Sequence, residues 1–217
     1  MEHQKELRNF MVAGAASIGL SLASHHVDQF MIYIQELMRW NKKINLTGID
    51  RPKEIIVKHF VDSLAALNAC NIPLNSVVID VGSGAGFPGI PLKIVREDFE
   101  LILVEPIHKK SSFLKSLIGL LNLENASTFD GTVQEYVNAP SKTLADLVVV
   151  RAVKFNEIIA SLKELLHQSG RAILYRVESI NPTEIGSNFI ITKELSFALP
   201  FGYGRRVISV VEIGKAA

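Results

Sequence analysis

The sequence Ser76-Val-Val-Ile-Asp-Val-Gly-Ser-Gly-Ala-Gly-Phe-Pro-Gly89 predicts a buried strand, a glycine-rich turn and the start of a helix. The β-branched run Val77–Ile79 is typical of a strand that is covered on both faces. The glycines at 82, 84 and 86 let backbone N–H groups approach a ligand without Cβ clashes. Pro88 suits the first turn of the following helix, where its missing N–H costs nothing. The stretch therefore predicts a ligand loop that leads into a helix N-terminus.

Two classes of ligand are bound by loops of this kind. Gly84–Gly89 has the GxGxxG spacing of dinucleotide-binding domains, in which the first glycine follows the strand directly. Here Asp80 ends the strand before Gly82, and an acid followed by GxGxG is the arrangement of S-adenosylmethionine (SAM) methyltransferases. SAM carries a sulfonium and an ammonium group and no pyrophosphate, so a carboxylate near the loop is useful. Glu105 ends the next apolar run, about 20 residues on, where a ribose-binding carboxylate is expected. The loop indicates SAM in preference to a dinucleotide or to a generic tight turn with two surface acids.

The composition is that of an ordinary globular protein, with 48% hydrophobic and 21% charged residues among 217. This length suits one large domain, or a domain with a small appendage. The net charge of +1 does not itself indicate a nucleic-acid partner, although a local patch could. Cys70 is the only cysteine, which excludes an intrachain disulfide and a cysteine-based metal cluster and fits a reducing cytosol. We predict a cytoplasmic protein with no metal site, and we expect a monomer, although the sequence leaves the oligomeric state open.

The N-terminal region predicts two helices. Lys5 and Arg8 precede an apolar run, Phe10–Ala23, that has some likeness to a secretory signal, but two glutamates, two glycines and two serines weaken it. We therefore predict a first helix there, followed by a second helix that Ser24 caps. No stretch is long and apolar enough to span a bilayer. The apolar stripe of the second helix consists of Val27, Phe30, Met31, Ile34, Leu37 and Met38.

A basic segment runs from Arg39 to His59, with six cations and two acids, a local charge of +4. Cations interleaved with Trp40 and amide side chains could hold phosphates and stack on bases. A solvated connector with Trp40 anchored in the core fits the same pattern equally well. We divide the chain into an N-terminal helical extension with this basic segment, 1–52, and a catalytic domain, 53–217. The cations are Arg39, Lys42, Lys43, Arg51, Lys53 and Lys58.

The segment Lys53–Ala69 predicts one helix, with His59, Asp62 and Ser63 on or beside its polar face. From Ser76 onward, predicted strands and helices alternate, which indicates a parallel α/β sheet. The loop Pro200–Gly204 joins the last two strands without a helix, which predicts a hairpin with one antiparallel strand at the sheet edge. The predicted strands are Ser76–Val81, Leu101–Glu105, Ala126–Phe129, Leu144–Val150, Arg171–Arg176, Phe189–Leu195 and Val207–Ile213, and the predicted helices are Pro88–Val95, Lys109–Leu121, Val133–Val137 and Asn156–Leu166.

The predicted fold class is therefore α/β and Rossmann-like, that of class I SAM methyltransferases. It combines a mostly parallel seven-stranded sheet, helices on both faces and a C-terminal antiparallel hairpin. Ligands of such sheets bind beyond the carboxyl ends of the strands. We expect the groups at 131–134 to face an adenine, and Arg151 and Arg176 to face the substrate.

Six segments closely resemble the bacterial 16S ribosomal RNA methyltransferase G family, also called glucose-inhibited division protein B. They are Trp40–Thr47, His59–Leu64, Asp80–Pro91, Val104-Glu105, Lys109–Leu114 and Arg151-Ala152. The resemblance covers the chain from about Ser24 to Ile213. It implies SAM-dependent methylation of a guanine N7 in 16S rRNA, with the rRNA or the 30S subunit as the partner.

The resemblance also implies residue roles. The cofactor contacts carried over from the family are Gly82, Phe87, Glu105, Val133, Gln134 and Arg151, and the loop adds Asp80, Ser83 and Gly84. Two departures stand out: the family often has Gly-Arg-Ala-Glu where this chain has Gly131-Thr-Val-Gln134, and Lys-Gly where it has Arg176-Val177. Arginine is not equivalent to lysine at a tight site. The expected RNA contacts are Lys42, Lys43, Asn45, His59, Lys109, Lys110, Arg176 and Arg205.

Arg151 is the predicted catalytic residue, because arginine commonly reads guanine and no general base is needed. Guanine N7 is an exposed lone pair that can attack a methyl group without losing a proton first. Three other hypotheses stay open: a SAM methyltransferase of a small molecule or protein, a nicotinamide-dependent reductase that uses Gly84–Gly89, and a cofactor-binding regulator without turnover.

Overall fold

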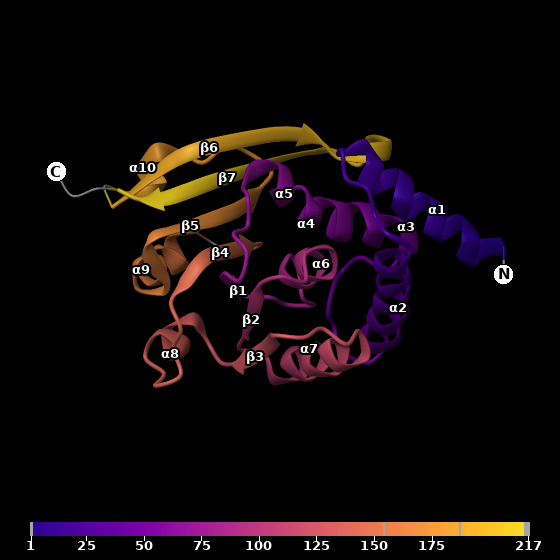
Figure 1. The fold of residues 1–217 in the computed structure, drawn as a ribbon, viewed down its shortest axis with the longest axis horizontal. Helices are drawn as coiled ribbons and strands as arrows, with labels where there is room; N and C mark the ends of the chain where they lie inside the picture. Colours follow the sequence, from indigo (N-terminus) through magenta and orange to yellow (C-terminus); the bar gives the residue numbers. More distant parts are fainter. Residues whose placement is uncertain (1, 154, 187, 215–217) are drawn as a thin grey trace.

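The structure, a computed structural model, describes residues 2–153, 155–186 and 188–214. Its centre is a seven-stranded sheet in the order β3-β2-β1-β4-β5-β7-β6 (Figure 1). Strands β1 to β5 are parallel, and β7 is antiparallel to both β5 and β6. The predicted fold class is confirmed. The strands are β1 Val77–Val81, β2 Glu100–Glu105, β3 Ala126–Asp130, β4 Ala145–Arg151, β5 Leu166–Arg176, β6 Phe189–Ala198 and β7 Arg205–Ile213.

Helices cover both faces of the sheet, and each face has its own hydrophobic core (Figure 1). Alternate strand residues point to opposite cores, as the period of two requires: Val149 belongs to one cluster and Val150 to the other. The first face carries α1 Glu2–Ser17, α2 Ser24–Asn41, α3 Pro52–Ile55, η1 Ile56–Val61, α4 Asp62–Leu64, α5 Ala66–Ala69, α6 Gly89–Val95 and α7 His108–Leu120, and the second carries α8 Val133–Val137, α9 Phe155–Leu165 and α10 Pro182–Ile185.

The segment predicted as one helix over Lys53–Ala69 is broken into short pieces around the π-helical turn η1. A π turn inserts an extra residue and rotates everything after it around the helix axis. As a result, Asp62 and Ser63 are buried, 3% and 0% exposed, rather than on a polar face. The prediction of their exposure was wrong because the apolar spacing of the sequence carries no sign of this rotation.

The boundary between α9 and β5 also differs from the prediction. Leu166, placed in the helix, is the first residue of β5 and pairs with Ala145. The register then shifts before Leu147 pairs with Arg171, so residues between them form a bulge. Gly170 allows it, because a Cβ there would lie 2.8 Å from the carbonyl oxygen of Ala145.

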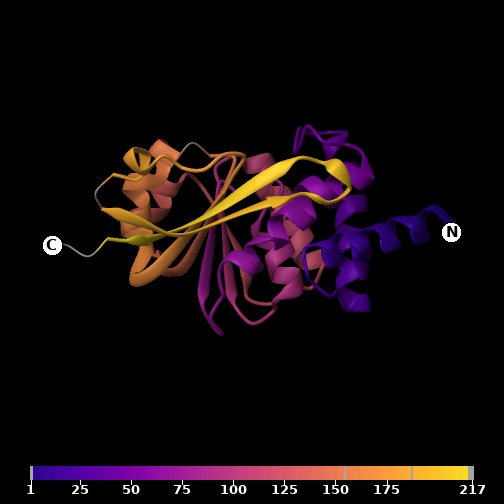
Figure 2. The same cartoon turned by 90° about the horizontal axis from the view of Figure 1, so that it is seen from above.

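The C-terminal hairpin reaches across the molecule to the N-terminal helices (Figure 2). Its second strand, β7, lies inside the sheet and β6 forms the edge, so the antiparallel strand is not at the edge as predicted. The reason is burial: residues 207–211 of β7 are buried, whereas β6 is largely exposed. The tip, which includes η2 Pro200–Gly202, is fixed on α1 by stacking of Phe201 on Phe10 at 4.4 Å.

The N-terminal helices share the core of the sheet. Met11 of α1 and Phe30 of α2 are fully buried in the same cluster as Val78 of β1. Ala23, not Ser24, is at the N-cap of α2, and its N–H donates to Nδ1 of His26 at 3.3 Å. The division of the chain into a helical extension, 1–52, and a catalytic domain, 53–217, stays a prediction. Among the described helices, none has the length and apolar character needed to cross a membrane.

Phe30→Ala tests whether α2 is an integral part of this core. The ring is fully buried and lies 4.8 Å from that of Phe60, so we expect the free energy of unfolding to fall by about 3–5 kcal/mol. The measurement is chemical unfolding followed by circular dichroism. Ile32→Ala, on the exposed side of the same helix, should cost about 1 kcal/mol or less. Equal unfolding midpoints for Phe30→Ala and the unmodified protein would show that α2 does not support the sheet.

Candidate active site

The glycine loop lies where the strand order reverses, because β1 has β2 on one side and β4 on the other. Such a switch point opens a crevice at the carboxyl ends of the strands. Gly84 has a φ of +59°, and a Cβ there would have nothing nearer than the carbonyl oxygen of Gly82 at 3.9 Å. This part of the loop therefore faces open space, with room for a ligand.

Tyr33 of α2 holds the loop from the opposite side. Its hydroxyl donates to the carbonyl oxygen of Ala85 at 2.5 Å, and its ring stacks on Phe87 at 5.3 Å. Burial raises the pKa of Tyr33 well above its usual value, so the hydroxyl stays a donor. Gly86 is needed here, since a Cβ would lie 2.7 Å from this hydroxyl oxygen. Sequence reasoning missed Tyr33, although a tyrosine among buried helix positions signals a hydroxyl that needs a partner.

Glu105, at the end of β2, restrains the loop through backbone groups. One carboxylate oxygen accepts the N–H of Gly84 at 2.7 Å, and the other accepts that of Ile107 at 2.9 Å. The side chain is 3% exposed. The predicted ribose-binding carboxylate is thus held beside the open part of the loop.

Asp80, at the end of β1, is completely buried beneath the same loop. Its Oδ2 accepts the N–H of Gly89, the first residue of α6, at 2.7 Å. Its Oδ1 has no hydrogen-bond partner among the described residues. Burial raises the pKa of Asp80 to about 7, and the hydrogen bond from Gly89 and the charge of Arg151 oppose that rise. Asp80 therefore supports the start of α6 from inside the protein.

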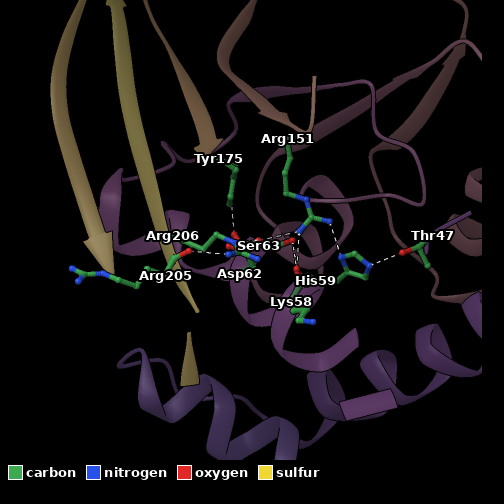
Figure 3. Close-up of polar contacts among 9 residues, drawn as sticks. All are labelled: Thr47, Lys58, His59, Asp62, Ser63, Arg151, Tyr175, Arg205 and Arg206. Carbon is green, nitrogen blue, oxygen red and sulfur yellow. Dashed lines mark hydrogen bonds and ion pairs between the residues drawn. The ribbon is translucent and has the colours of Figure 1, made fainter. Parts of the chain in front are cut away.

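Arg151, at the end of β4, is the centre of a polar cluster on the same face of the sheet (Figure 3). Its guanidinium donates to the carbonyl oxygen of Lys58 at 3.2 Å and to Nδ1 of His59 at 3.0 Å. It also lies 5.0 Å from the centre of the Phe87 ring. The predicted catalytic residue thus contacts the glycine-loop residue Phe87 and the π-helical segment together.

His59 is neutral, and its tautomer follows from its partners. Burial first, and the charge of Arg151 second, lower the pKa of His59 to about 3. A guanidinium has only donors, so Nδ1 accepts from Arg151 and Nε2 carries the proton. Nε2 then donates to the hydroxyl oxygen of Thr47 at 2.8 Å. Thr47 links the basic segment to the site, which the sequence did not indicate.

Asp62 joins Arg151 to the C-terminal hairpin. Its Oδ2 lies 3.4 Å from Nη1 of Arg151 and 3.4 Å from Nε of Arg206 in β7 (Figure 3). Burial raises the pKa of Asp62, and the two arginines counteract that rise. Among the described residues, no hydrogen bond joins Asp62 or Ser63 to the glycine loop. The Ser63 hydroxyl donates to the carbonyl oxygen of His59, and the Ser63 carbonyl oxygen accepts from the Tyr175 hydroxyl at 2.6 Å. The sequence did not indicate the contact between Asp62 and Arg206.

The cations of the basic segment differ in how they are paired, and Arg51 lies 3.7 Å from Glu54. Arg39, Lys53 and Lys58 pair with acids at 2.6–2.7 Å. Lys42 and Lys43 are exposed and make no ion pair within the described part of the chain. The neighbouring Asn45 is exposed too, whereas Trp40 is half-buried and packs edge-on against Phe113 at 5.6 Å, so this ring is anchored on the core.

The other predicted RNA contacts lie in three places. Lys109 is exposed and Lys110 half-buried at the start of α7, and Arg205 is exposed beside Arg206. Arg176 is separated from Arg151: β4 and β5 pair Arg151 with Tyr175, so Arg176 points to the opposite face, where it contacts Glu184 at 3.3 Å. The structure therefore does not bring the two arginines together.

The segment expected to face the adenine follows β3. Thr132 is at the N-cap of α8, and its hydroxyl and Glu135 form a capping box. Val133 is buried and Gln134 is exposed beside it. The departure at Thr132 thus has a local role in starting α8, because the side chain satisfies backbone N–H groups at the helix end.

The seven-stranded sheet, its strand order and the loop at its switch point define a class I methyltransferase fold. Solved structures with this arrangement include MtNAS in complex with MTA and tNA, with a TM-score of 0.60, 14% identity, and coverage of 86% of this chain and 70% of that one. TrmN from Thermus thermophilus is also similar, with a TM-score of 0.59, 12% identity, and coverage of 71% and 48%.

The GidB family, described as rRNA small subunit methyltransferase G, matches residues 26–188. Proteins named ribosomal RNA small subunit methyltransferase G are 33% identical in Oenococcus oeni, over 90% of this chain and 85% of that protein, and 30% identical in Clostridium beijerinckii, over 91% and 94%. The relative in Lachnoclostridium phytofermentans is 38% identical over 70% of this chain, and the match spans 63% of that protein's length. The chain belongs to this family, as the motifs predicted.

Asp80→Asn tests the buried carboxyl through the pH dependence of stability. The folded-state pKa, about 7, lies above the ordinary value of 3.8, so the folded protein binds more protons between these values. The contribution of Asp80 to stability is therefore full below about pH 4 and is lost as the pH rises through 7. Relative to the variant, the unmodified protein should lose at most about 4 kcal/mol over this range, measured by chemical unfolding.

His59 has the opposite effect, and it supplies the control. Its pKa is lowered to about 3, so its contribution is present above pH 6.5 and is lost as the pH falls through 3. In the unmodified protein, the gain in stability from His59 on raising the pH partly offsets the loss due to Asp80. In a His59→Gln background this offset is absent, so the loss due to Asp80 should be easier to see. Parallel curves for this background with and without Asp80→Asn would show that Asp80 titrates normally.

Proposed function

We propose that the chain is a SAM-dependent methyltransferase that transfers a methyl group to N7 of a guanine in 16S rRNA. The observation that carries this proposal is the placement of Arg151 against Phe87, beside a glycine loop restrained by Glu105. Membership of the rRNA small subunit methyltransferase G family supports it. The proposed place of action is the cytoplasm, where ribosomal RNA is found.

The loop fits SAM by its geometry and its donor set. The open side of Gly84 leaves space for a nucleoside. The Glu105 carboxylate beside it can accept hydrogen bonds from the ribose hydroxyls. Val133 and Gln134 would flank the adenine, and Gly82, Ser83, Gly84 and Phe87 the remainder of the molecule. A structural neighbour, a mutant of MtNAS, was solved in complex with S-adenosylmethionine. When bound, SAM supplies an electrophilic methyl group.

A dinucleotide fits the same loop less well. Dinucleotide folds place the pyrophosphate on the N–H groups at the start of the helix that follows the loop. Here the first of these, the N–H of Gly89, is already bound by Asp80. This buried carboxyl under the helix end disfavours a pyrophosphate, and this observation counts against a nicotinamide-dependent reductase.

The chain's own residues would align the base and need not remove a proton. Guanine presents N7 and O6 as acceptors on one edge, and arginine donates to that edge. Arg151 is held in place by Lys58, His59 and Asp62, so it can present a guanidinium N–H with little loss of entropy. His59 stays neutral and adds no second charge next to a purine that becomes cationic on methylation. The base would have to be unstacked to enter the site.

The experiment that tests this function is transfer of labelled methyl groups to 30S subunits from cells that lack the endogenous modification, in a single turnover. Label in a guanine of 16S rRNA, lost when SAM is omitted, is the expected result. Label in a small molecule or protein, or none with SAM bound, would instead support the methyltransferase of another substrate or the regulator. Titration calorimetry with SAM and with NAD tests the reductase hypothesis, which requires NAD to bind.

Arg151→Ala should lose activity with the fold intact. We expect methyl transfer to 30S subunits to fall roughly 100-fold, because a misaligned base loses its attack geometry. Arg151→Lys should not restore it, since an ammonium cannot bridge Lys58 and His59 in the same way. The matched change Arg176→Ala, on the opposite sheet face, should cost less. A larger loss in Arg176→Ala would transfer the assigned role to Arg176.

Neutralising Lys42 and Lys43 should weaken rRNA binding in a salt-dependent manner. Each phosphate contact adds about 0.7–0.9 to the slope of log K against log salt, so the double change to Gln should reduce that slope by about 1.5. Filter binding of 16S rRNA over a range of salt concentrations measures it. Arg39→Gln is the control, because its guanidinium is already paired with Glu36 at 2.6 Å. If log K for rRNA does not change with salt concentration, Lys42 and Lys43 do not belong to the RNA-binding surface.

A further inference from the structure

The hairpin tip lies against the N-terminal helices (Figures 1 and 2), and a hollow lined by residues of both lies between them. Its volume is about 290 Å³, at the small end of the range for ligand pockets. Three segments far apart in the sequence form it, and none of its residues belongs to the Arg151 cluster. The lining residues are His3, Leu7, Arg51, Pro52, Lys53, Glu54 and Tyr203. We call it the tip cleft.

The aromatic wall of the tip cleft is held in place without a ligand. The neighbouring Phe201 stacks on Phe10 of α1 and has a φ of +58°, a left-handed conformation that the surrounding structure must hold. The ammonium group of Lys58 lies 5.4 Å from the centre of the Tyr203 ring. Because the ring is already positioned, a base that stacks on it loses little binding energy to ordering.

The polar wall of the tip cleft offers a cation to an incoming anion. The Arg51 side chain is 81% exposed and pairs only loosely with Glu54, at 3.7 Å. The other charges are already engaged: Lys53 with Glu6 at 2.6 Å, and Glu54 with Lys58 at 2.7 Å. A planar ring, a loosely paired guanidinium and the apolar side chains of Leu7 and Pro52 match a nucleotide, whose base stacks while its phosphate pairs with arginine.

The tip cleft is connected to the Arg151 cluster by direct contacts. Lys58 lies over Tyr203, and the carbonyl oxygen of Lys58 accepts a hydrogen bond from Arg151 at 3.2 Å. Arg206, three residues after Tyr203, reaches Asp62 at 3.4 Å. A strand whose target base lies at Arg151 can therefore continue along the hairpin to Tyr203.

We propose that the tip cleft binds one unpaired nucleotide of the RNA strand that carries the target guanine. The base stacks on Tyr203, and a phosphate pairs with Arg51. This inference rests on the proposed function, since it takes RNA as the substrate. It assigns Tyr203 and Arg51 to substrate binding, outside the group that aligns the methyl acceptor.

The test is photocrosslinking of the full chain to a short single-stranded oligouridylate that contains 4-thiouridine. We expect the main adduct in the peptide that carries Tyr203. In fluorescence anisotropy, Tyr203→Ala should bind this RNA roughly tenfold more weakly, whereas Tyr203→Phe, which keeps the aromatic face, should bind normally. Arg51→Gln should lower the salt slope by about one, and the matched control Arg171→Gln, which lines no part of the tip cleft, should leave it unchanged.

Adducts confined to other peptides, with Tyr203→Ala binding as tightly as the unmodified protein, would overturn the proposal. Competition by uridine monophosphate at the same nucleotide concentration would also overturn it, because the tip cleft would then be a site for a free nucleotide. Failure of the proposed function is recognised separately, as an absence of methyl transfer to 30S subunits by the unmodified protein. An adduct at Tyr203 would still establish RNA binding at the tip cleft in that case.

Discussion

Two buried carboxylates tie the glycine loop to the ends of its neighbouring strands, and the rest of the site is arranged around that restraint. Glu105 binds the N–H of Gly84, and Asp80 binds that of Gly89, each at 2.7 Å. Tyr33 adds a third tie, from the N-terminal helix α2. The loop is therefore ordered by folding, so a ligand does not have to supply the free energy of ordering it. The cost is the burial of Asp80, which its raised pKa records.

Burial also limits how charges can be arranged around Arg151, because two poorly solvated cations need a carboxylate between them. Two guanidinium groups and one carboxylate, those of Arg151, Arg206 and Asp62, give this cluster of three side chains one net positive charge. Without Asp62 the two cations would repel each other in a poorly solvated place. His59 adds hydrogen bonds but no charge, since its pKa is far below neutral. The Arg151 cluster thus keeps one positive charge, and Asp62 separates its two cations.

Features that depend on local periodicity could be predicted from the sequence, and those that depend on long-range register could not. The alternating β-branched runs and the spaced glycines around Asp80 gave the parallel sheet, the loop and the family. Nothing local pairs Asp62 with Arg206, 144 residues away, or Tyr33 with Ala85. The π turn before Asp62 cannot be seen in the sequence, so the burial of Asp62 was not predicted. Arg176 was grouped with Arg151 because the register that pairs Arg151 with Tyr175, and so turns Arg176 to the other face, is not visible in the sequence.

The C-terminal hairpin, β6 and β7, is the last part of the sheet to be synthesised. The glycine loop and Arg151 are complete before β7 is made, but β7 brings Arg206 to Asp62 and covers β5. A chain that stops before residue 205 would leave the edge of β5 unpaired, and an open edge invites aggregation. Prematurely terminated products would therefore tend to associate with one another through the open edge of β5.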